Sequence, residues 1–350
     1  MADDNPLTPG PRRSTPPERL EVRRAGNGGA PASAAVQPPK IPYFLVLEQQ
    51  RQAFLQNFDA SRDNLRRELI RNIQQHRGSR VVVYYSVETL TPKHAELLQD
   101  ILAMRPATSR LDLFLLSPGG FADAGHKMAT LCRAQTVDRF GVLIPYYAKS
   151  AATLLCLGAD ELVMGPASEL GPIDPRIRVP DQYGRVVNVS AVSLREALEL
   201  LERRAEGKPE NALLYAPLLE KVDLNLIGEY ERALKSSRQI AETQLFRYML
   251  RDDPAKAADV AEKLSSQYFS HGHAIERTEA REVLGLNVVE PNSELWDAMW
   301  QLHKHYAAVI EDSPVTNRIH AVFESEDIKF TETAGPGVVG GTDETRSVGP

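Results

Sequence analysis

A single serine precedes an apolar segment in the stretch YYAKSAATLLCLGADE, residues 146–161. Ser150 follows a polar turn, and residues 151–158 after it are almost wholly apolar and typical of a helix. Serine is a common helix N-cap because its hydroxyl accepts a hydrogen bond from an early backbone N–H. It can also be a nucleophile, because the free N–H groups and the macrodipole of a helix N-terminus stabilise an oxyanion. The local sequence allows both roles.

Two other segments could complete a site around Ser150. Upstream, LLSPGG (115–120) runs from an apolar segment into a Pro-Gly-Gly turn, where backbone N–H groups can face a ligand. Downstream, GADELVMGPASELGPIDP (158–175) presents Asp174 in a loop braced by Pro and Gly. Taken singly, each is an ordinary turn, so their order along the chain carries the argument.

The elements that must position these turns alternate along the chain. The patterns predict strands at 80–86, 111–117, 140–148 and 161–166, and helices at 91–104 (N-cap Thr91), 122–134 and after Ser150. Such alternation is typical of an α/β fold with a mainly parallel sheet. Later segments read as helices at 193–206 (capping box Ser193 and Glu196), 224–250, 256–267, 276–285 (cap Thr278, then a strand) and 293–311 (cap Ser293).

In this order, the segments resemble the Clp protease/crotonase superfamily, which includes Clp proteolytic subunits, signal peptide peptidases of the A type and enoyl-CoA hydratases. LLSPGGFADAGHKMATLC is similar to the corresponding Clp segment. The resemblance implies a Clp/crotonase-like fold: repeated ββα units, a mainly parallel sheet flanked by helices, helical additions and disordered tails. It also implies Ser150 as nucleophile, an oxyanion hole from the N–H groups of Gly120 and Ala151, and substrate contacts at Gly119 and Phe121.

The predicted base departs from the Clp pattern. With the segments aligned on Pro166, the usual histidine position holds Ile173, the neighbour of Asp174. The usual aspartate position falls in SHGHAIERTEAREVLGL, which carries His271 and His273. The order Ser…Asp…His is similar to the prokaryotic family labelled serine dehydrogenase proteinase, and a triad is defined by geometry rather than chain order. This resemblance implies His271, four residues before Ile275, as base, with His273 as alternate and Asp174 orienting the imidazole.

Three alternatives stay open from the sequence. A Ser–Lys dyad, as in the signal peptide peptidase branch, could use Lys149, Lys208 or Lys221. A non-catalytic relative could keep the fold as a scaffold or binding module. A crotonase-type acyl-CoA enzyme could use the same oxyanion hole, although a serine at the nucleophile position speaks against it.

Composition excludes several other classes. The net charge of −6 and the scattered basic residues argue against nucleic acid as the main partner. No run of about 18 apolar residues or secretory leader is present, so we expect no membrane span and a cytoplasmic location. Cys132 and Cys156 lie in apolar helical patterns, as buried free thiols would. Walker A, HExxH and zinc-ligand spacings are lacking, so we expect no cofactor or metal.

We therefore expect a serine peptidase that acts on peptide or protein substrates and forms a homo-oligomer, to which an apolar stripe over residues 293–311 could contribute. That stripe could equally pack on its own domain. The predicted organisation is a Pro/Gly/Arg-rich disordered tail (1–40), an N-terminal helix (41–77), the hydrolase domain (78–290), a C-terminal helix (291–324) and a second disordered tail (325–350).

Overall fold

The structure is a computed structural model that describes residues 61–180, 183–206, 215, 224–314 and 318–333. The predicted tail 1–40, the tail residues beyond 333, most of the predicted helix 41–77 and the candidate lysines Lys208 and Lys221 lie outside these residues. Within the described part, residues 61–77 are helical.

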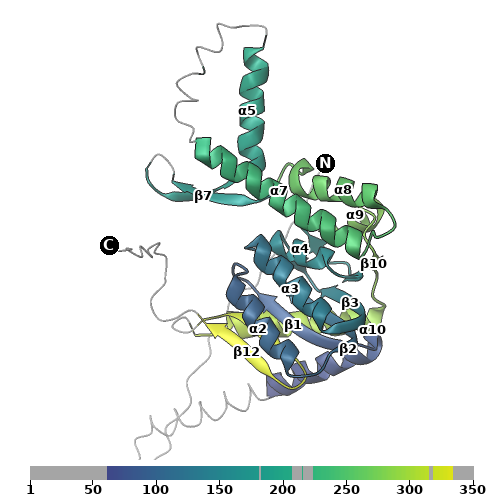
Figure 1. Cartoon of the computed structure of the whole chain (residues 1–350). Coiled ribbons are helices and arrows are strands. Elements are labelled where there is room, and N and C mark those ends of the chain that lie inside the picture. Colours follow the sequence, from purple (N-terminus) through teal and green to yellow (C-terminus); the bar gives the residue numbers. More distant parts are fainter. Residues whose placement is uncertain (1–60, 181–182, 207–214, 216–223, 315–317, 334–350) are drawn as a thin grey trace, which may run out of the picture. The chain divides into compact units, whose positions relative to one another are not determined.

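A seven-stranded sheet forms the centre of the described chain (Figure 1). Its order is β10-β5-β3-β2-β1-β11-β12, and the five strands from β10 to β1 pair in parallel. Two antiparallel strands, β11 and β12, extend the sheet beyond β1. The bounds are β1 Arg80–Ser86, β2 Thr108–Leu116, β3 Thr136–Ile144, β5 Glu161–Met164, β10 Val288–Val289, β11 Ile319–Glu324 and β12 Lys329–Thr333. The predicted α/β fold with a mainly parallel sheet is confirmed.

Side-chain alternation along the central strands feeds two hydrophobic cores. In β1, Val82 and Tyr84 join one cluster, whereas Val81 and Val83 join the other, because successive strand residues point to opposite faces. The first cluster is covered by α2 (Pro92–Ala103), α3 (Ala122–Ala134), α4 (Ala151–Leu157), α7 (Leu224–Arg247) and α8 (Pro254–Glu262). The second is covered by helix 61–77 and α10 (Ser293–Glu311). The buried strands therefore read as continuous apolar runs.

Smaller elements complete the described fold. A three-stranded sheet joins β4 (Tyr147–Ala148), β6 (Glu169–Leu170) and β9 (Ile275–Glu276). A hairpin of β7 (Arg176–Pro180) and β8 (Val186–Ser190) leads into α5 (Ala191–Ala205). A π-helical turn, η1 (Lys263–Gln267), follows α8, and α9 (Arg277–Glu282) follows β9.

The predicted helix caps were right at α2 and wrong at three other helices. Thr91 and the first-turn Pro92 begin α2, as predicted. Helix α5 is capped by Ser190 rather than Ser193, because the Ser190 hydroxyl accepts from Val192 N. In α10 the cap is Asn292, whose side chain accepts from Leu295 N, and in α9 it is Glu276. The observed cap therefore lies three residues before the predicted one in α5, two residues before it in α9 and one residue before it in α10.

The chain after α10 also differs from the prediction of a helix over 291–324 and a disordered tail from 325. The helix ends at Glu311, and β11 and β12 extend the sheet instead. Segment 319–324 is a strand because Ala321, Val322 and Phe323 are fully buried beside β1. The apolar stripe of α10, which includes Leu295 and Tyr306, is buried against its own sheet, which settles where that stripe packs.

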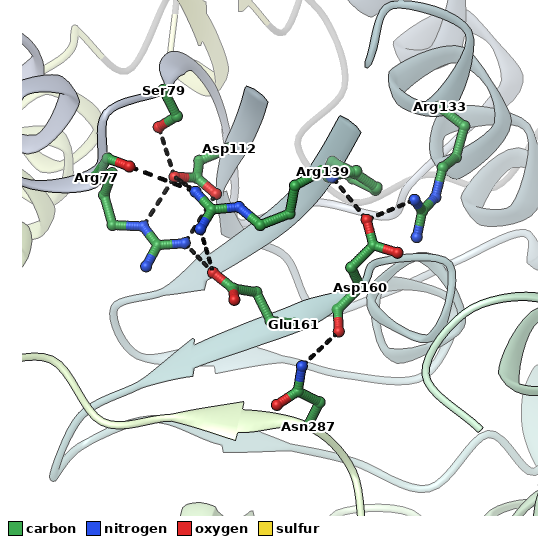
Figure 2. A network of polar contacts seen from close by, with 9 residues as sticks. Arg77, Ser79, Asp112, Arg133, Arg139, Asp160, Glu161 and Asn287 are labelled. Atoms are coloured by element: carbon green, nitrogen blue, oxygen red, sulfur yellow. Dashed lines mark hydrogen bonds and ion pairs between the residues drawn. The ribbon is translucent and has the colours of Figure 1, made fainter. Parts of the chain in front are cut away.

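A polar network joins helix 61–77 to three parallel strands (Figure 2). The fully buried Asp112 of β2 accepts hydrogen bonds from Arg77 Nε (2.9 Å) and Ser79 Oγ (2.6 Å). Arg77 also pairs with Glu161 of β5, and Arg139 of β3 reaches the same carboxylate at 3.2 Å. Burial alone would lower the pKa of Arg77, but its carboxylate partners raise it, so the guanidinium stays charged. The network therefore holds the strands in register through compensated buried charge.

Asp112→Ala should destabilise the protein by roughly 3–5 kcal/mol, because it leaves the Arg77 guanidinium without its buried partner. Urea unfolding followed by circular dichroism would measure the loss. Asp100→Ala, on the exposed face of α2, is the matched control and should change the unfolding free energy by no more than about 0.5 kcal/mol. Equal midpoints for the two variants would contradict this role for Asp112.

Candidate active site

Ser150 has an unusual backbone conformation. Its φ of 51° and ψ of −117° make it the one non-glycine residue with positive φ among those the structure describes. It occupies the N-cap position of α4, but its hydroxyl makes no capping hydrogen bond. The cap role suggested by the sequence is therefore not observed, and the hydroxyl is left for other chemistry. Strain of this kind persists only where surrounding contacts enforce it, and it gathers at functional sites.

The glycine turn after β2 packs directly against Ser150. A Cβ on Gly119 (φ +87°) would lie 2.7 Å from Ser150 Cβ and 2.9 Å from Ala151 N, so only glycine fits there. The Gly119 N–H donates to Ser117 Oγ at 3.1 Å. Gly120 bridges to Leu90 through Leu90 N→Gly119 O and Phe121 N→Leu90 O, and neither bond uses the Gly120 N–H. The turn thus brings the segment of Gly120 beside the first residue of α4.

The three-stranded sheet brings the other candidate residues to the same place. Ala148 of β4 pairs with Leu170 of β6, and Leu170 pairs with Ile275 of β9. Because β4 and β6 are parallel and β9 is antiparallel to them, the C-terminal ends of β4 and β6 lie at the same edge of the sheet as the N-terminal end of β9. Neighbouring strands lie about 4.8 Å apart. Ser150, Asp174 and His271 each lie two to four residues from this row, at one end of the sheet.

Asp174 and His271 are joined directly. His271 Nδ1 lies 2.7 Å from Asp174 Oδ1, and the Asp174 carboxylate is nearly buried. Its other oxygen, Oδ2, accepts a hydrogen bond from Ser190 Oγ at 2.9 Å. Since Ser190 also caps α5, the carboxylate lies near the N-terminus of that helix, where negative charge is favoured. Both oxygens of a nearly buried carboxylate are therefore satisfied.

Three further hydrogen bonds hold the segments around this pair. Ile173 N donates to Leu264 O of η1 at 2.8 Å, which ties the residue before Asp174 to the turn that precedes the His271 loop. Thr153 of α4 is fully buried, and its hydroxyl lies 2.8 Å from Ala148 O and 2.9 Å from Gly171 O. Helix α4 is thereby bonded to both β4 and the residue that follows β6.

The second candidate histidine, His273, contacts Glu279 and Tyr268. His273 Nε2 lies 3.2 Å from Glu279 Oε2, and its ring packs on Tyr268 with centroids 4.7 Å apart. Tyr268 also donates to Glu279 at 2.7 Å, and burial, followed by this carboxylate, raises the pKa of its hydroxyl. His273 therefore belongs to a neighbouring Tyr–Glu–His cluster, and the structure brings His271, not His273, to Asp174.

Lys149 adjoins Ser150, but its ammonium group is engaged. Lys149 Nζ forms an ion pair with Glu169 at 2.8 Å and donates to the carbonyls of Leu170 (3.0 Å) and His273 (3.2 Å). Within the described residues, no three His, Cys, Asp or Glu side chains gather where they could hold a metal ion.

Sequence reasoning missed two residues that support the candidate site. Ser190 had a readable signal, because a serine before an apolar helical segment is a typical N-cap, but Ser193 also fitted that pattern. Thr153 had none, since its contacts with β4 and β6 exist only after the strands pair. Phe121, predicted beside the oxyanion turn, is largely exposed there at the start of α3.

A serine on a strained strand-to-helix turn, with a hydrogen-bonded Asp–His pair at the same end of a small sheet, is typical of serine hydrolases. Comparison with known families identifies the branch. The chain belongs to the family of ClpP-like SDH-type serine proteinases, whose model matches residues 44–322, and it is a serine-type peptidase by class. The family predicted from the sequence is confirmed.

Curated relatives come from an archaeon, Methanocaldococcus jannaschii. Uncharacterized protein MJ1495 is 28% identical over 234 residues, which cover 63% of this chain and 70% of the relative. Uncharacterized protein MJ0137 is 29% identical over 196 residues, covering 55% of this chain and 58% of the relative. The match thus spans little more than half the length of the second relative.

Solved structures show more distant similarity. The 1510-N membrane-bound stomatin-specific protease, as a substituted variant, is 14% identical with a TM-score of 0.39, covering 63% of this chain and 84% of its own. ClpP1 from Listeria monocytogenes is 13% identical with a TM-score of 0.36, covering 65% and 97%.

Ser190→Ala should slow the reaction of the site serine about tenfold, because Asp174 loses one of its two hydrogen-bond donors. The second-order rate of labelling by a fluorophosphonate measures this. Ser193→Ala is the matched control, since Ser193 is an exposed residue in the first turn of the same helix, and it should label at the wild-type rate. Equal rates for both variants would mean that Ser190 only caps α5.

Proposed function

We propose that this serine peptidase hydrolyses peptide bonds through an acyl-enzyme on Ser150. His271 is the general base, and Asp174 orients its imidazole. The backbone N–H groups of Gly120 and Ala151 form the oxyanion hole. The observation that carries the proposal is the 2.7 Å contact between His271 Nδ1 and Asp174 Oδ1 at the end of the small sheet where Ser150 lies.

The contact with Asp174 supports one tautomer of the neutral His271 imidazole. An ionised carboxylate only accepts hydrogen bonds, so Nδ1 of the neutral imidazole carries the proton and donates it to Asp174. The lone pair of Nε2 is then free to receive a proton from Ser150. Asp174 also stabilises the imidazolium that forms, because its charge is nearly buried and held by the Ser190 hydroxyl.

The reaction then follows from these roles. Ser150 Oγ attacks the peptide carbonyl carbon while its proton passes to His271 Nε2, and the carbonyl oxygen becomes an oxyanion. His271 returns that proton to the leaving amine as the C–N bond breaks. A water molecule, deprotonated by His271, attacks the acyl-enzyme, which releases the acid and restores the Ser150 hydroxyl.

The turns around Ser150 support the oxyanion hole. Ala151 is the first residue of α4, so its N–H has no partner within the helix. The Gly120 N–H takes no part in the bridge to Leu90, and Gly119 packs against Ala151 N. The exposed Phe121 ring next to this turn is available to contact a substrate side chain. Gly119, the other predicted substrate contact, is buried, and its N–H and carbonyl are bonded to Ser117 and Leu90.

The alternatives from the sequence gain less support. The bonded ammonium of Lys149 speaks against its role as the base of a Ser–Lys dyad, and Lys208 and Lys221 lie outside the described residues. Membership of a serine proteinase family speaks against an acyl-CoA enzyme or a scaffold.

The proposal also includes a cytoplasmic location and assembly into a homo-oligomer. Cys132 and Cys156 are free and buried, and burial raises the pKa of the Cys132 thiol to about 12, as suits unreactive cysteines in a reducing cytoplasm. Among the described residues, no helix combines the length and apolar character needed to cross a bilayer. A homo-oligomer remains a prediction from the family resemblance.

Ser150→Ala should abolish fluorophosphonate labelling, because the labelling step needs the serine oxygen to form the bond to phosphorus as fluoride leaves. His271→Ala should slow it by about 10²–10⁴-fold, the usual contribution of a positioned general base. Rates are read by gel fluorescence against probe concentration.

His273→Ala is the matched control, because this side chain faces Glu279 and Tyr268 rather than Asp174. It should label much faster than His271→Ala. If His273→Ala is the slower variant, the base is assigned wrongly; if Ser150→Ala labels like the wild type, the nucleophile is wrong.

A further inference from the structure

We infer that Lys149 is a positioning residue that holds the His271 loop against the nucleophile turn. This inference rests on the proposed function and goes beyond it, because it gives the lysine next to Ser150 a role other than base. The ammonium of Lys149 lies where three segments of the site meet, and its contacts connect the residue before Ser150 to the segments of Asp174 and His271.

The side chain of Lys149 reaches three acceptors from two other segments. Its Nζ pairs with Glu169 Oε1 at 2.8 Å and donates to Leu170 O at 3.0 Å, both in β6, which leads to Asp174. It also donates to His273 O at 3.2 Å, two residues after His271. An ammonium group has three N–H donors, so these acceptors satisfy it completely.

The backbone of Lys149 is bonded to the oxyanion side of the site. Lys149 N donates to Ser117 O at 3.0 Å, just before the Pro-Gly-Gly turn. Lys149 O accepts from Ala152 N at 2.9 Å in the first turn of α4. One residue therefore connects the glycine turn, the nucleophile helix and the two segments that carry Asp174 and His271.

Gly171 makes room for this arrangement. A Cβ on Gly171 would lie 2.6 Å from Lys149 Cδ and 3.5 Å from Lys149 Cα, so the lysine stem passes directly over the glycine. The side chain is only 17% exposed, although it ends in a charge. A largely covered side chain with a glycine beneath its stem and three acceptors at its end occupies a built position for lysine rather than that of a surface charge.

The His271 loop needs such a tether. Residues 269–274 between η1 and β9 are mostly exposed, and the ring of Phe269 is fully solvent-accessible. The His271 imidazole is held by Asp174, but that bond fixes only the side chain. The bond from Lys149 to His273 O fixes the backbone on the other side of the base. A displacement of about 1 Å at a catalytic group can cost on the order of 10²-fold in rate.

The inference is tested by fluorophosphonate labelling of Lys149→Met in the wild-type and His271→Ala backgrounds. Methionine keeps an unbranched stem of similar length and removes the donors. We expect labelling to slow at least about tenfold in the wild-type background, the scale of hydrogen bonds to a charged group. We expect little further loss in the His271→Ala background, because residues that act as a unit are non-additive. Lys127→Met, an exposed lysine of α3, is the matched control and should label normally.

Two further variants keep the test decisive. Gly171→Ala displaces the lysine stem without changing any charge, and it should also slow labelling. It replaces Lys149→Met in the test if that variant does not fold. Lys149→Arg should recover only part of the rate, because a planar guanidinium cannot direct its donors at these three acceptors as an ammonium does. Thermal unfolding confirms that each variant tested is folded.

The outcomes separate this inference from the proposed function. If Ser150→Ala labels like the wild type, the proposed function fails. If labelling requires Ser150 but Lys149→Met labels at the wild-type rate, only the positioning role fails. Equal losses from Lys149→Met in both backgrounds would also overturn it, since Lys149 would then act independently of His271. Loss of the pH dependence in Lys149→Met, but not in His271→Ala, would make Lys149 the base and overturn both the inference and the assignment of His271.

Discussion

The pairing of β4, β6 and β9 is the constraint on which the candidate site depends. The three strands come from segments more than a hundred residues apart at their extremes, and each is only two residues long. Their register places Ala148, Leu170 and Ile275 in one row, so the chain reaches Ser150, Asp174 and His271 within four residues of it. A slip of one residue would turn the side chains of a strand to the opposite face. Thr153 and Lys149 bond across this small sheet and oppose such a slip.

The large sheet supplies the rigidity that lets Ser150 keep a strained backbone. A residue with positive φ and a Cβ needs neighbours that prevent relaxation. Gly119 packs against Ser150, and a Cβ on Gly125 of α3 would collide with Ala151 O, so α3 and α4 approach closely there. On the other side of the sheet, the core formed with α10 and helix 61–77 holds the strands, and the Asp112 network fixes their register. The strain at one residue is thus enforced by contacts from several elements.

Three charged side chains at or beside the site, Asp174, Lys149 and Glu279, each bind more than one partner. Asp174 has both oxygens occupied, Lys149 has three acceptors, and Glu279 binds both Tyr268 and His273. Paired charges at low exposure keep fixed orientations, which a site needs if it is to stabilise charge that develops only in the transition state. Lys149 and His273, the alternative bases, bind Glu169 and Glu279, whereas the proposed base His271 binds Asp174. Elsewhere, His94 is buried between Tyr84 and Glu332, and burial lowers its pKa despite that carboxylate, as suits a packing residue.

The sequence by itself determined the α/β class, the central strands, the family and the short motifs that hold Ser150, Gly120, Asp174 and His271, because these depend on local pattern and turn chemistry. It also predicted the α2 cap correctly. It did not predict β11, which is a strand because β1 offers it a partner, or β12, which pairs with β11 in turn. It also missed the caps of α5 and α10, where a neighbouring serine fitted the pattern as well, and that of α9, which is Glu276. Only the tertiary structure decided which histidine meets Asp174, that Ser190 binds the same carboxylate, and that the Lys149 ammonium binds the loops of Asp174 and His271. Those contacts join residues up to 124 positions apart, and strand register, which no local pattern encodes, brings them together.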